Sequence, residues 1–458
     1  MRTQVTLHLG DALALPLPDA SVDAIVTDPP YGLEFMGVAW DTMRDDGKAR
    51  ARNEWGDFGS REHARHPSEV AGIQRKKNLS FYEFSAAWAA EAYRVLKPGG
   101  FMLAFGGTRT VHRLTSAIED AGFEIRDGIT WLYGSGFPKS LDVSKAIDKA
   151  AGAEREMVGL SPHSGNRAAS TFQADDTAHG YVGRAEGERT VTAPATDAAS
   201  QWEGWGTALK PAHEPIVVAR KPLVGTVAAN VLAHGTGALN IDGCRVAWDG
   251  PPPTIGTPGW GGPRKKLGAV PNGGGETVDR TPPNAAGRWP SNVVFTHASD
   301  CGEACTPDCP VAELDAQSGV STSSGGSGAA SRGALGKNGV YGKFANDRTD
   351  MAHSGGVGDS GGASRFFPVF RYQAKAPARE RPKVNGVGHP TVKPLALMRW
   401  LVRLVTPPGG VVLDQFAGSG TTVEAAILEG FSVIGVEQDP TYLPLIEARI
   451  DRVKGVKK

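Results

Sequence analysis

The chain has 458 residues, 40% of them hydrophobic, and its 49 Lys and Arg residues balance 49 Asp and Glu residues. This length suffices for two domains or for one large, elaborated domain with a real core. Zero net charge gives no sign of a globally basic, nucleic-acid-binding chain, so any basic surface must be local. The 60 Gly and 32 Pro residues exceed average usage, and we expect much of the chain to be loop.

Strand and helix patterns alternate over residues 1–150. Lys97-Pro98-Gly99-Gly100 is typical of a helix end. Apolar runs predict strands at Val5–Leu9, Val22–Thr27, Phe101–Phe105 and Ile125–Tyr133, and helical spacing predicts helices at Phe81–Lys97 and Thr108–Gly122.

Residues 151–388 are rich in Gly, Pro, Ser, Thr and Ala, which favours mobile loops. Patterned islands remain at Gly204–Pro222, Leu239–Ala247 and Trp289–Thr296. Several tryptophans argue against a plain disordered linker, which is the alternative. We interpret this part as a long Gly/Pro-rich insertion with ordered islands.

Regular patterns return in residues 389–458. They predict helices at Pro394–Thr406, Thr421–Gly430 and Tyr442–Val453, with strands at Val411–Asp414 and Ser432–Glu437. Strands that alternate with helices indicate an α/β protein with a parallel, doubly wound sheet. The predicted parts are therefore 1–150, 151–388 and 389–458.

A glycine loop follows the strand at Val411–Asp414 and opens a helix. Its residues are Asp414, Gln415, Phe416, Ala417, Gly418, Ser419, Gly420 and Thr421. Glycines allow a tight turn and a close approach to a ligand. Glu437 ends the next strand, where an acidic side chain can accept hydrogen bonds from ribose hydroxyls. The loop predicts a nucleoside-bearing cofactor; an ordinary strand-to-helix turn is the alternative.

A second motif, Asp28-Pro29-Pro30-Tyr31, follows the strand at Val22–Thr27. The prolines fix the backbone and donate no N–H. The Asp28 carboxylate and the Pro29 carbonyl can therefore accept both hydrogens of one exocyclic amine, and Tyr31 offers a flat ring for stacking. The alternative is a proline turn that merely ends the strand.

Together the two motifs resemble those of the amino-group DNA methyltransferases that use S-adenosylmethionine. Similar enzymes carry an Asp, Asn or Ser before two prolines and an aromatic residue, and a cofactor loop of the form Phe-x-Gly-x-Gly. The catalytic motif precedes the cofactor loop here, which looks like the circularly permuted beta class. The resemblance therefore implies a Rossmann-like sheet and a middle insertion that recognises target DNA.

The resemblance also implies roles for further residues. His389–Pro394 matches the segment before the family's cofactor loop, so Thr391 and Lys393 would lie near the methionine end of the cofactor. Asp11 would face the cofactor's adenine amine. The family often has Pro where Gln415 stands, and we expect only a small change in loop stiffness.

The implied substrate is a base flipped out of double-stranded DNA. Asp at the first motif position resembles the N6-adenine enzymes, whereas Ser is usual in N4-cytosine enzymes, the alternative. From other classes, a dinucleotide-dependent oxidoreductase and a catalytically silent DNA-binding module are alternatives, but neither needs an amine clamp. A homodimer and a restriction partner stay open.

Four cysteines do not make a disulfide framework, residues 1–16 lack a signal-peptide pattern, and no apolar run approaches the roughly 20 residues of a membrane span. We therefore expect a cytoplasmic protein of a bacterium or phage-infected host, with no membrane partner.

Cys301, Cys305 and Cys309 recur at every fourth position. A loop folded at Pro307 and Pro310 would gather them around zinc, with Cys244 or His297 as fourth ligand. The spacing matches no common zinc pattern, so free thiols and no metal are the main prediction.

Two basic segments are candidates for DNA contact. Arg365, Arg371 and Lys375 alternate with aromatic residues, and cations of this kind bind phosphates. A strand with a solvated charged face is an equal alternative. Lys76 and Lys77, after the first motif, are the second candidate.

Overall fold

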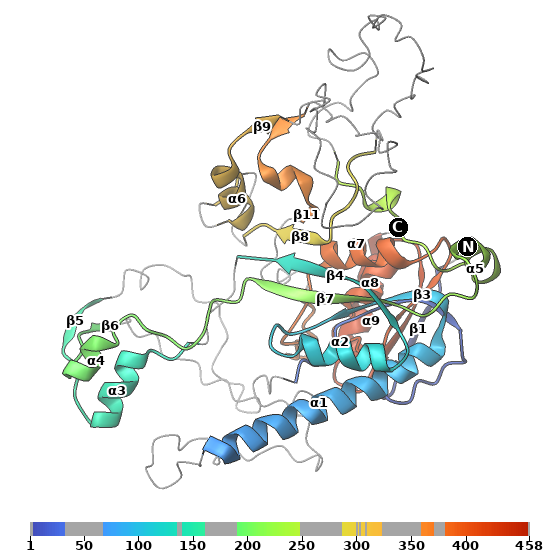
Figure 1. The fold of residues 1–458 in the computed structure, drawn as a ribbon. Helices are drawn as coiled ribbons and strands as arrows, with labels where there is room; N and C mark the ends of the chain where they lie inside the picture. Colours follow the sequence, from blue (N-terminus) through green and yellow to red (C-terminus); the bar gives the residue numbers. More distant parts are fainter. Residues whose placement is uncertain are drawn as a thin grey trace, which may run out of the picture. The chain divides into compact units, whose positions relative to one another are not determined.

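The computed structural model describes ten stretches of the chain (Figure 1). They are residues 3–32, 67–134, 140–160, 190–247, 286–298, 301, 304–306, 309–322, 359–370 and 381–456, with only the backbone for residues 67–78, 160 and 190. The chain forms two compact units. Unit 1 comprises Met1–Ala51, Arg65–Ser135 and Ala212–Lys458, and unit 2 comprises Arg52–Ala64 and Gly136–Pro211.

A nine-stranded sheet, counted over the described residues, forms the centre of unit 1. Its order is β1-β13-β12-β2-β3-β7-β4-β8-β11, and all neighbours are parallel except β7, which runs antiparallel to β3 and β4. This mostly parallel sheet confirms the predicted α/β class. The strands are β1 (Val5–Leu9), β2 (Val22–Thr27), β3 (Leu96–Phe105), β4 (Glu124–Leu132), β7 (His213–Arg220), β8 (Val293–Thr296), β11 (Val369–Phe370), β12 (Val411–Asp414) and β13 (Ser432–Glu437).

Helices cover both faces of this sheet, which explains why its central strands are apolar throughout. Side chains alternate along β2, so that Ile25 packs with Trp88 of α1 while Val26 joins the cluster that contains Leu401 of α7 and Ile446 of α9. Figure 1 shows α1 and α2 on one side of the strands and α7 on the other. The helices are α1 (Pro67–Val95), α2 (Val111–Asp120), α7 (Leu395–Val405), α8 (Thr421–Leu428) and α9 (Leu443–Val456).

Shorter elements complete unit 1. A small apolar cluster forms around Phe295, Val311 and Phe367, beside the strand pair β8–β11. The shorter elements are α5 (Val227–His234), the 3-10 helix η5 (Asp242–Cys244), α6 (Pro310–Ser318), the strands β9 (Ser321–Thr322) and β10 (Ser360–Gly361), and the 3-10 helix η7 (Ala363–Phe366).

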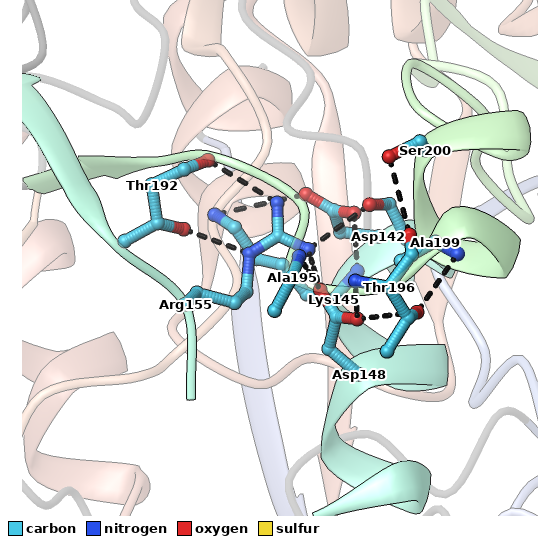
Figure 2. Close-up of polar contacts among 10 residues, drawn as sticks. Asp142, Lys145, Asp148, Arg155, Thr192, Ala195, Thr196, Ala199 and Ser200 are labelled. Atoms are coloured by element: carbon cyan, nitrogen blue, oxygen red, sulfur yellow. Dashed lines mark hydrogen bonds and ion pairs between the residues drawn. The ribbon is translucent and has the colours of Figure 1, made fainter. Parts of the chain in front are cut away.

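Unit 2 is held by a buried polar cluster (Figure 2). The Asp148 side chain is 1% exposed and pairs with Arg155 at 2.6 Å. It also accepts hydrogen bonds from the backbone N–H groups of Ala195 at 3.0 Å and Thr196 at 3.1 Å. These contacts tie the first helix of the unit to the turn before the second. The elements of unit 2 are α3 (Val143–Ala151), β5 (Met157–Leu160), β6 (Thr190–Thr192) and α4 (Asp197–Gln201).

Two observations bear on the predicted organisation. The predicted helix end at Lys97–Gly100 is instead part of β3, where a bulge between Val22 and Ala24 of β2 shifts the pairing and Gly99 adopts φ +76°. Strands β7, β8 and β11 arise from the predicted insertion yet join the central sheet. The boundaries at 150 and 388 and the circular permutation stay predictions. None of the described helices combines the length and the apolarity that a membrane span requires.

Candidate active site at the carboxyl edge of the sheet

The two sequence motifs meet at one edge of the sheet. Because β12 and β2 are parallel neighbours, their carboxyl ends lie side by side. Thr27, the last residue of β2, donates a hydrogen bond of 2.7 Å from Oγ1 to Oδ1 of Asp414, the last residue of β12. The Asp28 motif and the glycine loop begin directly after these two residues. The structure therefore brings together the motifs that lie at opposite ends of the sequence.

Asp28 lies in a group of four polar side chains, which we call the Asp28 cluster: Asp28, Tyr31, Glu214 and Lys393. Lys393 Nζ is 2.8 Å from Asp28 Oδ2, 3.1 Å from Glu214 Oε2 and 3.0 Å from the Tyr31 hydroxyl. The Tyr31 hydroxyl is also 2.9 Å from Asp28 Oδ1 and 3.1 Å from Glu214 Oε2, and one of these oxygens accepts its proton. Two carboxylates and one ammonium give the cluster a net charge of −1 when Tyr31 is neutral.

The fold explains why Glu214 reaches this cluster. The antiparallel direction of β7 places its first residues, rather than its last, at the carboxyl edge of β3. Other neighbours hold the motif in place. Thr110 Oγ1 donates a hydrogen bond of 2.9 Å to the Tyr31 carbonyl, and Lys393 Nζ lies 4.8 Å from the centroid of the Phe105 ring.

The Asp28 cluster shifts the protonation equilibria of its own members. Burial disfavours the ammonium form of Lys393, but the charges of Asp28 and Glu214 outweigh this effect and raise its pKa. Burial, followed by the same two carboxylates, raises the pKa of Tyr31 well above 10. At neutral pH, Lys393 is therefore a cation and Tyr31 is a neutral phenol.

The glycine loop turns from β12 into α8. Gly418 has φ +52° and Gly420, the residue before α8, has φ +82°, which are conformations that favour glycine. The Gly418 N–H donates a hydrogen bond of 2.7 Å to Glu437 Oε2, and the Ala417 N–H donates one of 2.9 Å to the Val436 carbonyl. The loop is thus fastened to the carboxyl end of β13.

Phe416 and Gln415 connect the loop to α1. The Phe416 ring packs against Trp88 and Phe84, with centroid distances of 5.7 and 6.2 Å. Gln415 is 2% exposed, and its Nε2 lies 3.5 Å from the Trp88 carbonyl. Where similar enzymes often have Pro, this chain therefore has a buried amide directed at the helix.

Two acidic groups of this edge titrate unusually. Burial raises the pKa of Asp414 to about 6, although hydrogen bonds from Thr422, Thr27 and Phe416 act in the opposite direction. Burial also raises the pKa of Glu437, against the N–H groups of Asp439 and Gly418. Both carboxyl groups already accept hydrogen bonds from their neighbours, Asp414 from Thr27 and Glu437 from Gly418.

The remaining predicted cofactor residues lie close by. Asp11 is exposed two residues after β1, the strand beside β13, and the N–H of the intervening Gly10 donates to the Glu437 carbonyl at 2.9 Å. Thr391 is half-buried next to His389, which a Cβ on Gly418 would approach to 3.0 Å. Ser419 and Thr421 are buried. Lys393 belongs to the Asp28 cluster, and its predicted contact with the cofactor stays a prediction.

This arrangement fits a nucleoside cofactor. Glu437 ends β13, and Asp11 follows the neighbouring strand β1 by two residues. Their carboxyl oxygens are acceptors of the kind that ribose hydroxyls and an adenine amine need. Each Glu437 oxygen accepts one backbone N–H, from Gly418 or Asp439, and a carboxylate oxygen can accept more than one hydrogen bond.

Of the residues predicted to contact DNA, only the side chain of Arg365 lies within the part of the chain that the structure describes. Arg371 and Lys375 lie outside the described residues, as do the side chains of Lys76 and Lys77. Arg365 is buried, with its side chain 2% exposed and paired to Asp359 at 3.0 Å. Its guanidinium also donates to Ser321, so its donors serve the interior instead of DNA.

Sequence reasoning missed Glu214, Thr110 and Phe105. Thr110 and Phe105 carried no motif. Glu214 had one weak signal, since it is an acidic residue two positions before the apolar run at residues 216–219. Its direction toward the site follows from the antiparallel pairing of β7, which no local pattern indicates.

Comparisons with known proteins find type II methyltransferases among the relatives of this chain. Among curated proteins, the type II methyltransferase M.HindIII of Haemophilus influenzae is 26% identical over 233 residues, which are 49% of this chain and 60% of that protein. The type II methyltransferase M.BglI of Bacillus subtilis is 41% identical over 63 residues, or 14% of this chain and 18% of that protein. The chain thus spans less than two thirds of the length of these relatives.

Solved structures with weak similarity include the M1.HpyAVI–SAM complex, with a TM-score of 0.37 and 14% identity over 98% of this chain and 100% of that chain. The cytosine-N4-specific PvuII DNA methyltransferase has a TM-score of 0.38 and 12% identity over 98% and 87%.

The family model described as DNA methylase, for the N6/N4 methylases, matches residues 22–225 and 342–448. These ranges include both the Asp28 motif and the glycine loop, and they make up more than half of the chain. With the two motifs joined at one sheet edge, this match shows that the chain belongs to the N6/N4 family of DNA methylases.

Proposed function

We propose that the protein transfers a methyl group from S-adenosylmethionine to the exocyclic N6 amine of an adenine in double-stranded DNA. The observation that carries the proposal is the hydrogen bond of 2.7 Å between Thr27 and Asp414. It sets the amine-binding motif beside the glycine loop, so that an amine held by one lies next to a nucleoside held by the other. Family membership supports the same reaction class.

The Asp28 motif holds and orients the amine. One carboxylate oxygen of Asp28 and the Pro29 carbonyl accept its two hydrogens, which leaves the nitrogen lone pair free to attack the methyl group. As the nitrogen–methyl bond forms, the methyl–sulfur bond breaks, the thioether leaves, and the amine loses one proton, which Asp28 accepts and relays. Lys393 keeps Asp28 in place through the contact at 2.8 Å. The Tyr31 ring stacks on the base and recovers part of the free energy that flipping costs. Catalysis of this kind consists mainly of positioning and electrostatic stabilisation.

When bound, S-adenosylmethionine supplies an electrophilic methyl group on a cationic sulfonium. Glu437 and Asp11 would accept hydrogen bonds from its ribose and adenine, and the loop Phe416–Thr421 would contact its nucleoside. Thr391 and Lys393 would lie near its methionine portion. The net charge of −1 of the Asp28 cluster favours a sulfonium nearby, because opposite charges attract strongly at a partly buried site.

Parts of the chain outside this edge select and hold the DNA. We propose that residues 151–388 contain the target-recognition region, and that Lys76 and Lys77, followed by Arg371 and Lys375, contact phosphates. The chain acts in the cytoplasm of a bacterium or of a phage-infected host, alone, as a homodimer or with a restriction partner.

Adenine is favoured over cytosine by Asp28, which stands where Ser is usual in N4-cytosine enzymes. A dinucleotide-dependent oxidoreductase is disfavoured because the loop has Val423 where the third glycine of a dinucleotide motif would stand. A silent DNA-binding module would need neither the Asp28 cluster nor the cofactor loop.

Analysis of the reaction product tests this proposal. Unmethylated genomic DNA is incubated with the protein and S-adenosylmethionine, digested to nucleosides and measured by mass spectrometry. We expect N6-methyldeoxyadenosine above the level of a reaction without protein. N4-methyldeoxycytidine alone would transfer the proposal to the cytosine alternative, and the absence of both products would contradict it.

A further inference from the structure

A cluster of three thiols and one imidazole lies far along the chain from the site described above. It consists of His297, Cys301, Cys305 and Cys309, and we call it the Cys3His cluster. The ligand atoms of these four residues all lie within 4.8 Å of one another. Nδ1 of His297 is 3.3 Å from Sγ of Cys305 and 3.5 Å from Sγ of Cys309. Among the described residues, Cys244 is apart from this group, because it is buried against Trp400.

These separations agree with the geometry of tetrahedral zinc. With Zn–S bonds of about 2.3 Å and a Zn–N bond of about 2.0 Å, a sulfur and a nitrogen ligand lie about 3.5 Å apart, and two sulfurs about 3.8 Å apart. The Cys3His cluster needs only small shifts to meet these values. Three thiolates and one imidazole form a set that prefers zinc over magnesium or calcium, which bind oxygen ligands.

The surrounding fold presents the four ligands. His297 directly follows β8, and its N–H donates to the Phe370 carbonyl of β11 at 3.0 Å. Cys309 directly precedes α6 and is buried. Between these anchors, the Thr306 N–H lies 3.4 Å from Cys301 Sγ. A backbone N–H directed at a sulfur stabilises a thiolate, which is the form of Cys that binds a metal.

We infer that the Cys3His cluster is a structural zinc site that fastens the β8–α6 loop to the edge strands of the sheet. All four tetrahedral positions are filled by protein ligands, as in structural sites, so no position is left for a substrate. Zinc binding joins the end of β8, at His297, to the start of α6, at Cys309, and releases the protons of the three thiols.

The location of the cluster gives the ion its role. The apolar cluster beside it, which contains Phe295, Val311 and Phe367, has few buried side chains. Strand β11 has two residues and pairs with β8 at the edge of the sheet. A metal crosslink here stabilises an edge that apolar burial alone supports weakly. Residues after β11 include the predicted DNA-contacting Arg371 and Lys375.

The metal content of the full-length protein tests the inference directly. The protein is purified under reducing conditions without chelator, and zinc is measured by plasma mass spectrometry. We expect about one zinc per chain, and X-ray absorption should show about three sulfur ligands near 2.3 Å and one nitrogen near 2.0 Å. Less than about 0.1 zinc per chain after incubation with zinc chloride would overturn the inference, as would an intramolecular disulfide within the cluster in the reduced preparation.

Matched cysteine variants separate this site from adventitious zinc. Cys305→Ser changes an exposed ligand and should lower zinc affinity at least about tenfold in competition with a chromophoric chelator, whereas Cys305→His should restore part of it. Cys244→Ser changes a cysteine outside the cluster and should keep the zinc of the wild type. Equal zinc affinity of Cys305→Ser and the wild type would overturn the inference. Because Cys305 is exposed, this comparison avoids the folding defect expected for the buried Cys309.

Discussion

Lys393 Nζ lies 2.8 Å from Asp28 Oδ2, although one residue precedes α7 and the other follows β2. The contact is partly buried, with the two side chains 10% and 24% exposed. It links the start of the chain to its last third at the point where the proposed reaction occurs. Glu214, which is also paired with Lys393, makes the ammonium the shared cation of two carboxylates.

Replacing Lys393 should therefore destabilise unit 1. Lys393→Met leaves Asp28 and Glu214 facing each other without a cation, and removal of one partner of a buried ion pair costs about 3 kcal/mol. Urea unfolding measures the change. Lys454→Met, at an exposed position of α9, is the control and should stay within about 0.5 kcal/mol of the wild type. Equal losses in both variants would show that the Lys393 contacts add nothing to stability.

Gly418 and Gly430 form a matched pair for testing the cofactor loop. Both have positive φ, +52° and +84°, so alanine strains the backbone at either position. A Cβ at Gly418 also meets His389 Nε2 at 3.0 Å, whereas a Cβ at Gly430 meets open space. Gly418→Ala should weaken S-adenosylmethionine binding on the order of tenfold, a loss of about 1.4 kcal/mol. Calorimetry should find the affinity of Gly430→Ala unchanged; equal weakening would assign the effect to backbone strain alone.

Asp414 should make stability depend on pH. Its folded pKa of about 6 lies above the ordinary value of 3.8, because burial favours the neutral acid. The folded state therefore keeps the Asp414 proton to higher pH than the unfolded state does. The stabilisation that this proton gives is complete below about pH 4 and is lost as the pH rises through about 6. The difference approaches about 3 kcal/mol at neutral pH, since one pKa unit corresponds to about 1.4 kcal/mol.

Asp414→Asn isolates this effect, because the amide oxygen can still accept the hydrogen bonds of Thr27 and Phe416. Unfolding free energies of both proteins are compared between about pH 4 and 7.5. We expect the wild type to lose stability relative to Asp414→Asn as the pH rises through about 6. A constant difference across this range would contradict the assigned burial effect.

Asp148 should control the order of unit 2. Asp148→Ala removes the carboxylate that pairs with Arg155 and that accepts from the N–H groups of Ala195 and Thr196, whereas Arg155 keeps its hydrogen bonds to Thr192 and Ser144. Hydrogen exchange should then become faster in α3 and α4 and stay slow in β2 and β3. Lys149→Ala, at an exposed position of the same helix, should leave exchange in α4 unchanged. Unchanged protection in Asp148→Ala would place the stability of unit 2 elsewhere.

The sequence predicted the central strands well because their signals are local. Val22–Thr27, Val411–Asp414 and Ser432–Glu437 are short apolar runs with a turn motif at one end, and β2, β12 and β13 have these bounds. The motifs at their carboxyl ends then had to share one edge, since parallel neighbours end together. The contact between Thr27 and Asp414, which sets the two motifs side by side, agrees with this rule.

Non-local pairing explains what the sequence did not predict. The apolar run of β7 was recognised, but nothing in it indicates that it enters the sheet antiparallel between β3 and β4 and directs Glu214 to the site. Likewise, the buried polar cluster of unit 2 joins Asp148 to Thr196, residues too far apart in sequence for a local pattern. Arg365 was predicted to lie at the surface, because no sequence pattern indicates its ion pair with Asp359, six residues earlier.

The cysteines show the same limit. Their spacing matched no common zinc pattern, and Cys244 and His297 were both candidates for the fourth ligand. In the structure, His297 lies within the group of three cysteines, whereas Cys244 packs against Trp400 in the core and lies apart from them. Ligand choice was decided by the tertiary structure.

Asp28→Ala provides the most direct test of the central claim, that the Asp28 motif performs methyl transfer beside a separate cofactor loop. Transfer of labelled methyl groups to DNA and calorimetric binding of S-adenosylmethionine are measured on this variant and on Asp451→Ala, an exposed Asp→Ala control on α9. We predict that Asp28→Ala reduces the transfer rate on the order of a thousandfold or more and changes cofactor affinity less than about threefold. Methyl transfer by Asp28→Ala at the rate of Asp451→Ala would contradict the account.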